Sequence, residues 1–141
     1  MPNLHVEIIA PSRRVFRGEA QGVKAPGVEG SFEVLYNHAP LISAFEVGPI
    51  RVTATTGEEV FFATSGGIIE VIDNHVTVLA ETAEPASEID VERARAAEER
   101  ALELLEEEDS AAERRRAESA LERARNRLRI AMGQVGRRSR T

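Results

Sequence analysis

The seven residues Glu84-Pro85-Ala86-Ser87-Glu88-Ile89-Asp90 divide the 141-residue chain into two parts of different composition. All six aromatic residues and eight of the ten glycines lie before this stretch, and no proline follows Pro85. Beyond it the sequence consists largely of Ala, Glu, Arg and Leu, a composition typical of long helices. Because proline also disfavours helix at the residue before it, we place a domain boundary at residues 84–88, between domains 1–86 and 87–141.

Upstream of the boundary, short runs rich in β-branched and aromatic residues alternate with turn residues. Thr56-Gly57 and Asp73-Asn74 each separate two such runs and predict β-hairpins. In the last run, alternation with a period of two places Val76, Val78 and Ala80 on one face. The predicted strands are His5–Ile9, Arg14–Arg17, Ser31–Leu35, Ile50–Thr55, Glu59–Thr64, Ile68–Ile72 and His75–Ala80. Short strands at this spacing indicate an all-β sandwich or flattened barrel.

Downstream of the boundary, the pattern predicts an antiparallel α-hairpin. Ser87 with Asp90, and Ser110 with Glu113, have the spacing of a capping box, which marks two helix starts. Small apolar residues then recur every three or four positions, which predicts helices at about residues 88–108 and 111–132. Gly133 would end the second helix, and a loose tail would begin at residue 136. The apolar stripes are Ala94, Ala97, Ala101, Leu102 and Leu105 in the first helix and Ala117, Leu121, Ala124, Leu128 and Ala131 in the second.

Formal charge separates the hairpin into an acidic and a basic segment. The whole chain carries −6: residues 1–86 carry −6, residues 87–109 carry −7 and residues 110–141 carry +7. This net acidity argues against general nucleic-acid binding. The default interpretation is that the two helices attract each other, although exposed ion pairs contribute only about 0–1 kcal/mol each. The alternative is that such a hairpin opens easily and presents its basic helix to another protein.

The sequence has no signature of catalysis or of metal binding. Cysteine is absent, and His5, His38 and His75 lack metal-ligand spacing, so we interpret the histidines as structural. Neither a P-loop nor a nucleophile elbow is present. We therefore expect neither an enzyme nor a required cofactor. No apolar run approaches the ~20 residues that span a bilayer and no signal segment is recognisable, so we expect a soluble, cytosolic protein that meets a membrane only through a partner.

One cluster of charged side chains has the spacing of an anion site. Asp90, Arg93 and Arg100 share one face of the first predicted helix, and Arg123 and Arg127 share one face of the second. Together they would offer several guanidinium groups and one carboxylate to an anion that also carries a donor, such as a nucleotide. Salt bridges between the helices are the alternative, and spacing alone favours them.

Two longer segments carry a resemblance to a known family. They are Pro26-Gly27-Val28-Glu29-Gly30-Ser31-Phe32-Glu33-Val34-Leu35-Tyr36-Asn37-His38-Ala39-Pro40-Leu41, and Ser65-Gly66-Gly67-Ile68-Ile69-Glu70-Val71 with Asn74-His75-Val76-Thr77-Val78-Leu79-Ala80. The order and spacing of these two segments resemble those of the epsilon subunit of bacterial F-type ATP synthase. The resemblance covers essentially the whole chain. The β-then-α organisation predicted above agrees with that family.

The resemblance implies a non-catalytic subunit of the rotor's central stalk, on the cytoplasmic face of the bacterial inner membrane. Its β-domain would dock on the gamma subunit and on the ring of c subunits, which couples proton flow to ATP synthesis from ADP. The segment near the c-ring would be His38, Ala39, Pro40 and Leu41. The hairpin would fold on the β-domain or extend along gamma, where it inhibits ATP hydrolysis. Contacts with acidic segments of the alpha and beta subunits would then come from Arg114, Arg115, Arg116, Arg123, Arg125 and Arg127.

Some members of the family bind ATP as a regulatory ligand through a motif that reads Ile89-Asp90-Val91-Glu92-Arg93-Ala94 in this chain. Aligned positions that would assist are Glu84, Arg100, Arg123 and Arg127. Asp90 would accept from the adenine amino group while arginines neutralise the phosphates. Two other functions remain open: a free-standing ATP-binding sensor, and a structural adaptor made of a β-sandwich and a coiled-coil arm.

Overall fold

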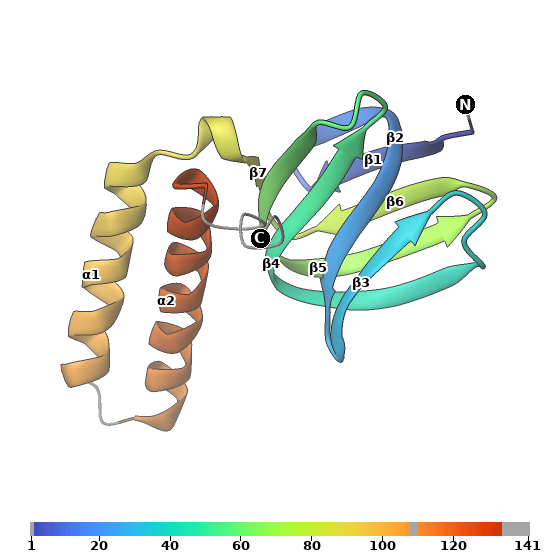
Figure 1. Cartoon of the computed structure of the whole chain (residues 1–141). Helices are drawn as coiled ribbons and strands as arrows, with labels where there is room; N and C mark the ends of the chain where they lie inside the picture. Colours follow the sequence, from blue (N-terminus) through green and yellow to red (C-terminus); the bar gives the residue numbers. More distant parts are fainter. Residues whose placement is uncertain (1, 108–109, 134–141) are drawn as a thin grey trace. The chain divides into compact units, whose positions relative to one another are not determined.

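A computed structural model describes residues 2–107 and 110–133, in two compact units that meet at the bond between Ala86 and Ser87 (Figure 1). The first unit is built of strands and the second of helices. The strands are β1 (Leu4–Ala10), β2 (Arg13–Gly27), β3 (Gly30–Leu35), β4 (Leu41–Ala54), β5 (Glu59–Ile72), β6 (His75–Ala80) and β7 (Ala83–Pro85). The helices are the short 3-10 helix η1 (Ala86–Glu88), α1 (Val91–Glu107) and α2 (Ala111–Ala131). The predicted fold class, a β-sandwich or flattened barrel followed by two helices, is confirmed.

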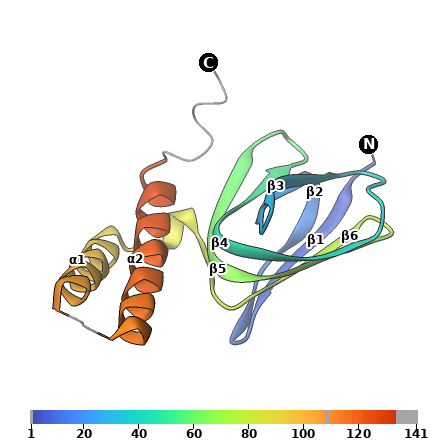
Figure 2. The same cartoon turned by 90° about the horizontal axis from the view of Figure 1, so that it is seen from below.

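The strands of the first unit close into a ring. Their order is β1-β6-β5-β4-β2, and β2 pairs in turn with β1. Every pairing in the ring is antiparallel except that of β1 with β6, the first and the last of the ring strands along the chain. β3 lies beside the second half of β2, and β7 lies beside β5. Figure 2 shows the sheet curving round the space that the core side chains fill.

Three strands are much longer than predicted. β2 has 15 residues, and β4 and β5 have 14 each. Glycine and proline in these strands mark bends instead of ends, because the ladder continues through Pro49, which pairs with Ala63, and through Gly67, which pairs with Ala80. The predicted strands Glu59–Thr64 and Ile68–Ile72 are therefore two halves of β5. Similarly, Arg14–Arg17 is part of β2, and Ile50–Thr55 covers the end of β4 and extends one residue beyond it. β7 was not predicted at all.

The predicted hairpin at Asp73-Asn74 is present between β5 and β6. Both residues have positive φ, 49° and 63°, as a two-residue type I′ turn requires. The register that this turn sets directs Val76, Val78 and Ala80 into the core, as predicted. One hydrophobic core fills the ring, and all of its members belong to the first unit: Leu4, Val6, Ile8, Ala20, Val23, Ala25, Val34, Phe45, Ile50, Val52, Phe62, Ile69, Val71, Val76, Val78 and Ala80.

The helix starts are set by capping side chains. Ser110 caps α2 as predicted, because its hydroxyl accepts from the backbone N–H of Glu113 at 3.3 Å. The start of α1 was predicted about three residues too early: the carboxylate of Asp90 accepts from the backbone N–H of Arg93 at 3.1 Å, and Ser87 belongs to η1. Asp90 is thus the cap itself. The predicted helix end at residue 108 and the tail from residue 136 lie outside the described residues.

Alanines form the seam between α1 and α2. Ala94 and Ala101 of α1, and Ala117 and Ala124 of α2, are all nearly fully buried. Leu102, which was predicted to support this stripe, is 41% exposed instead. Since alanine side chains remove little apolar area from water, the seam allows close approach of the helices with little hydrophobic stabilisation.

Candidate functional site

The arginines singled out in the sequence lie on one side of the helical hairpin. A helix turns by about 100° per residue, so Arg93 and Arg100 lie one step back from the buried Ala94 and Ala101. On α2, Arg123 likewise lies one residue before the buried Ala124. Because the helices are antiparallel, the residues one step back from the seam project to the same side on both. We call this side the basic face: Arg93, Arg100, Arg116, Arg123 and Arg127.

A shallow cleft between the helices confirms that residues of α1 and α2 meet on the side of the basic face. Leu104 of α1 lines it together with Glu113, Arg116, Ala117 and Ala120 of α2. Leu104 and Arg116 lie on the same side of their helices as the arginines of the basic face. Asp90 lies at the beginning of α1, on this side, and is exposed.

The opposite side of the hairpin carries pairs between the helices, and we call it the paired face: Glu98, Arg114 and Arg125. Nε of Arg125 lies 3.0 Å from Oε2 of Glu98. A guanidinium nitrogen of Arg114 donates to the backbone carbonyl of Leu105 at 2.8 Å, near the connection between the helices. An ion pair between the helices therefore exists, and its two residues are not members of the predicted nucleotide cluster.

The six arginines predicted to contact other subunits are divided among three directions. Arg116, Arg123 and Arg127 belong to the basic face, and the last two are half-buried. Arg114 and Arg125 belong to the paired face and are engaged with α1. The helix turn places Arg115 on the side away from α1, where it is exposed.

Other members of the predicted nucleotide site have structural roles. Asp90 uses one carboxylate oxygen to cap α1, and Ala94 is buried in the seam. Ile89 is half-buried between η1 and α1. Glu84 belongs to β7 in the first unit, where it is paired with Ala63 in the sheet.

The predicted c-ring segment, His38 to Leu41, forms the connection from β3 to β4. Ala39 and Pro40 are exposed, and the ring of His38 contacts the carbonyl of Ala39 at 2.7 Å. Asn37, with φ of 66°, lies in the same connection, directly before His38. Its backbone N–H donates to Oδ1 of Asn74 at 2.6 Å, and Nδ2 of Asn74 donates to Oδ1 of Asn37 at 3.3 Å. These two bonds fix the connection to the β5–β6 turn.

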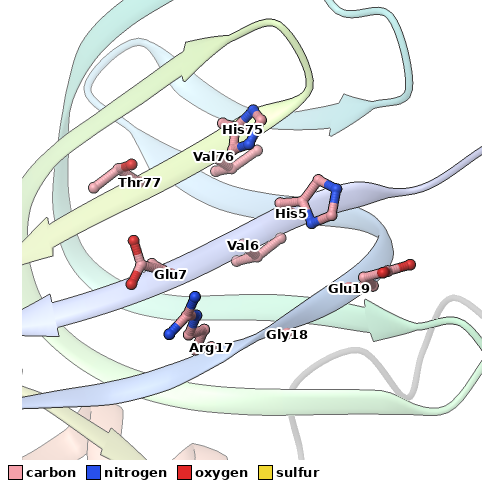
Figure 3. Close-up of a pocket in the computed structure, with 9 residues that line it drawn as sticks. All are labelled: His5, Val6, Glu7, Arg17, Gly18, Glu19, His75, Val76 and Thr77. Carbon is pink, nitrogen blue, oxygen red and sulfur yellow. The ribbon is translucent and has the colours of Figure 1, made fainter.

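A second cleft, of about 220 Å³, lies on the outer surface of β2, β1 and β6 (Figure 3). The rings of His5 and His75 are stacked at its end, with centroids 5.0 Å apart. Nearly parallel rings direct their in-plane nitrogen lone pairs side by side, so these lone pairs do not converge on one ion. The cleft is also smaller than the ~300–1,000 Å³ of typical small-molecule sites. Sequence reasoning missed this contact because it depends on the parallel pairing of β1 with β6, which no local signal reveals.

Within the described part of the chain, no three His, Asp or Glu side chains are grouped so that they could hold a metal ion. Among the same residues, no helix has the length and apolar character that crossing a bilayer would require. The basic face, on which Arg93, Arg100 and Arg116 are exposed and Arg123 and Arg127 are half-buried, is the strongest candidate binding surface of the second unit.

Comparison with known families divides the chain at the same point as the structure. Residues 3–86 match the family described as the beta-sandwich domain of the ATP synthase delta/epsilon chain, and residues 87–132 match the long alpha-helix domain of the same chain. The ATP synthase epsilon chain of Salinibacter ruber is 58% identical, over 96% of each chain. That of Syntrophomonas wolfei is 48% identical, over 88% of this chain and 90% of the relative.

Solved structures show the same fold at low identity. A chain of the Euglena gracilis mitochondrial ATP synthase, from a structure of OSCP, F1 and the c-ring, superposes with a TM-score of 0.81 and 23% identity. The superposition covers 94% of this chain and 82% of that one. A chain from the central stalk and c-ring of the Tetrahymena thermophila enzyme superposes with a TM-score of 0.60 and 17% identity, over 91% and 96% of the two chains.

Proposed function

The chain belongs to the ATP synthase delta/epsilon family as an epsilon chain, and from this premise we propose that it is a non-catalytic subunit of the central stalk. In this role it couples the proton-driven rotation of the c-ring to ATP synthesis from ADP. The observation that carries the proposal is coverage: both units match the family, and a relative 58% identical is matched over 96% of both chains. The likeness to chains from F1/c-ring and central-stalk structures supports the fold.

The partners follow from this position in the enzyme. The β-domain binds the gamma subunit and the c-ring, and the arm reaches the alpha and beta subunits. The protein is thereby peripheral on the cytoplasmic face of the bacterial inner membrane. In support, the relatives are bacterial epsilon chains, and the similar solved chains come from assemblies that include the c-ring.

For the c-ring contact we propose the segment His38 to Leu41. Two features support this choice: Ala39 and Pro40 are exposed, and the hydrogen bonds between Asn37 and Asn74 hold the segment in one position on the barrel. A loop that is already fixed loses little conformational entropy when it binds. Capture of the c-ring by the β-domain, lost when Ala39 and Pro40 are both replaced by Asp, tests the assignment. Equal capture by this variant would rule the segment out.

For inhibition of ATP hydrolysis we propose contacts of the arm's arginines with acidic segments of the alpha and beta subunits. The candidates are Arg114, Arg115, Arg116, Arg123, Arg125 and Arg127. The basic face supports this, because a row of like charges steers and orients an acidic partner. The test is the ATPase rate of a reconstituted catalytic head with the full chain and with a chain that ends at Ala86. An unchanged rate would remove the inhibitory role.

For ATP we propose regulatory binding at the basic face. Arg93, Arg100, Arg123 and Arg127 lie on one side of the hairpin, which suits several phosphate oxygens. One carboxylate oxygen of Asp90 accepts the capping hydrogen bond of α1. The carboxylate retains further acceptor capacity, which the adenine amino group could use. Ile89, half-buried before α1, completes the proposed set on the hairpin. The sequence also predicts Glu84, which belongs to the first unit, and Ala94, which is buried in the seam.

Isothermal titration of the isolated chain with ATP tests this binding, with the Arg123→Gln variant and an Arg115→Gln control. Binding that weakens for Arg123→Gln alone supports the site, because Arg115 lies on another side of α2. Absence of heat at millimolar nucleotide would dispose of ATP as a ligand, and of a free-standing ATP sensor with it. Failure of the β-domain to capture either gamma or the c-ring would count against the central-stalk role and favour a structural adaptor instead.

A further inference from the structure

The two faces of the hairpin differ in the charges that meet across the seam. On the basic face, guanidinium groups of both helices outnumber the carboxylates of Asp90 and Glu113, which lie on the same side. On the paired face, a carboxylate of α1 meets a guanidinium of α2 at 3.0 Å. We propose that the Glu98–Arg125 ion pair sets how readily the two helices separate. Its significance for inhibition rests on the proposed function, whereas the separation itself is a property of the isolated chain.

The weakness of the seam gives this pair its influence. The fully buried residues at the centre of the seam are Ala94 and Ala101 of α1 and Ala117 and Ala124 of α2, whose methyl groups bury little area. The leucines of the two apolar stripes, Leu105, Leu121 and Leu128, are only half-buried. Leu102 and Leu104 are 41% and 46% exposed and add little to the contact. Where hydrophobic packing contributes little free energy, a single ion pair contributes a larger fraction of the free energy that holds the two helices together.

Position along the helices adds to this effect. Arg114 donates to the carbonyl of Leu105 beside the connection between the helices, where the chain itself already keeps them close. Glu98 lies seven residues before Leu105, about 10 Å farther along α1 at 1.5 Å per residue. When a hairpin opens about its connection, groups farther from that point separate more. The Glu98–Arg125 pair therefore opposes opening where the movement is larger.

The pair is less exposed than the ion pair within α1. The side chain of Glu98 is 28% exposed and that of Arg125 is 48% exposed. Within α1, the exposed pair of Glu92 with Arg95 has a longer separation, 3.7 Å, and the Glu92 side chain is 87% exposed. The second pair lies within one helix, so it cannot hold the two helices together. It provides the matched control.

Opening would also change which charges are available to partners. Arg114 and Arg125 both interact with α1 in the closed hairpin. Once the helices separate, the guanidinium of Arg125 loses its carboxylate partner on α1 and becomes available to carboxylates of another protein. The ion pair therefore links the closure of the hairpin to the number of arginines that the arm presents.

The absence of cysteine makes a direct test simple. Ala96 and Glu122 are exposed, one on each helix, and replacing both by Cys gives two sites for spin labels on the full chain. Electron–electron distance measurements should show one short distance for the parent. Glu98→Gln should raise the ratio of open to closed hairpins about two- to fivefold, as expected from an ion pair worth up to ~1 kcal/mol. Glu92→Gln should leave the ratio unchanged.

A charge exchange separates pairing from other effects of the mutation. Combining Glu98→Arg with Arg125→Glu should restore the parent distances. Equal ratios for Glu98→Gln and Glu92→Gln would overturn the proposal, and so would an exchange that fails to restore closure. If circular dichroism shows that Glu98→Gln loses helix, Arg125→Gln replaces it. ATP is left out throughout, so a hairpin that responds as expected but neither binds ATP nor inhibits hydrolysis refutes the proposed function alone.

Discussion

At the scale of single residues, Gly67 is the position where the barrel has no room for a side chain. A β-carbon there would lie 2.0 Å from the backbone carbonyl oxygen of Leu79, and backbone cannot move aside as a flexible side chain can. We expect Gly67→Ala to lower the free energy of unfolding by about 1–3 kcal/mol, because the β5–β6 ladder must shift. Urea unfolding followed by circular dichroism measures this loss.

Gly18 supplies the control for this substitution. It is also a strand residue, but an added β-carbon would meet only the ring of Phe16, at 3.4 Å. Gly18→Ala should therefore unfold close to the parent midpoint. Equal midpoints for the two variants would show that β5 and β6 adjust to the added atom more easily than their register suggests.

Asp90 combines a capping role with a proposed ligand role, and two substitutions separate them. Asp90→Ala removes the acceptor for the Arg93 N–H and should destabilise α1 by about 1 kcal/mol. Asp90→Asn keeps a capping oxygen and removes the charge, so helix content should stay near the parent value. Circular dichroism at 222 nm distinguishes the two. Equal helix loss in both would show that the charge, acting on the helix dipole, matters more than the cap.

At the scale of elements, the alanine seam sets the distance between α1 and α2. Ala101 is 2% exposed, so Ala101→Leu must push the helices apart. We expect it to destabilise the hairpin by about 1–3 kcal/mol, while Ala96→Leu at an exposed position of the same helix should have little effect. The far-ultraviolet helix signal during thermal unfolding reports the change. A hairpin that accepted leucine at Ala101 as well as at Ala96 would have a looser seam than the burial indicates.

Element types were predictable from the sequence, whereas strand lengths were not. The Asp73-Asn74 turn, the inward face of β6 and the Ser110 cap depend on residues close together in the chain, and all three are present. The glycines and prolines of β4 and β5 are also visible locally in the sequence. Whether such a residue ends a strand or only bends it depends on whether the neighbouring strand continues to pair with it. That information lies elsewhere in the chain, so the prediction divided β5 into two strands and included only the last part of β4.

The candidate site was predictable to a similar degree. Spacing alone placed Arg93 with Arg100, and Arg123 with Arg127, on common helix faces. It could not reveal that Arg125 turns to the other side and pairs with Glu98, because this depends on how far one helix has slid along the other. Nor could it reveal that Asp90 is the cap of α1, since Ser87 has equally suitable chemistry.

At the scale of the whole molecule, the barrel contains its own core. All of the core residues precede residue 81, so a chain that ends at Ala86 should fold without the arm. We expect cooperative thermal unfolding of this truncated chain, with the strand signal of the full-length protein. Its amide resonances should be dispersed and, away from the truncation, close to those of the full chain. A truncated chain that fails to unfold cooperatively would show that the arm is needed for the barrel's stability.

The parallel pairing of β1 with β6 has a consequence for synthesis of the chain. β1 is made first, yet its parallel partner is the last strand of the ring. During translation the barrel therefore cannot close until residue 80 has left the ribosome, and until then β1 is exposed along one edge. Contacts so distant in sequence slow folding, and unpaired strand edges are prone to associate with other chains. The same pairing that removes the sheet's edges in the finished protein thus leaves the nascent chain open to aggregation for most of the barrel's synthesis.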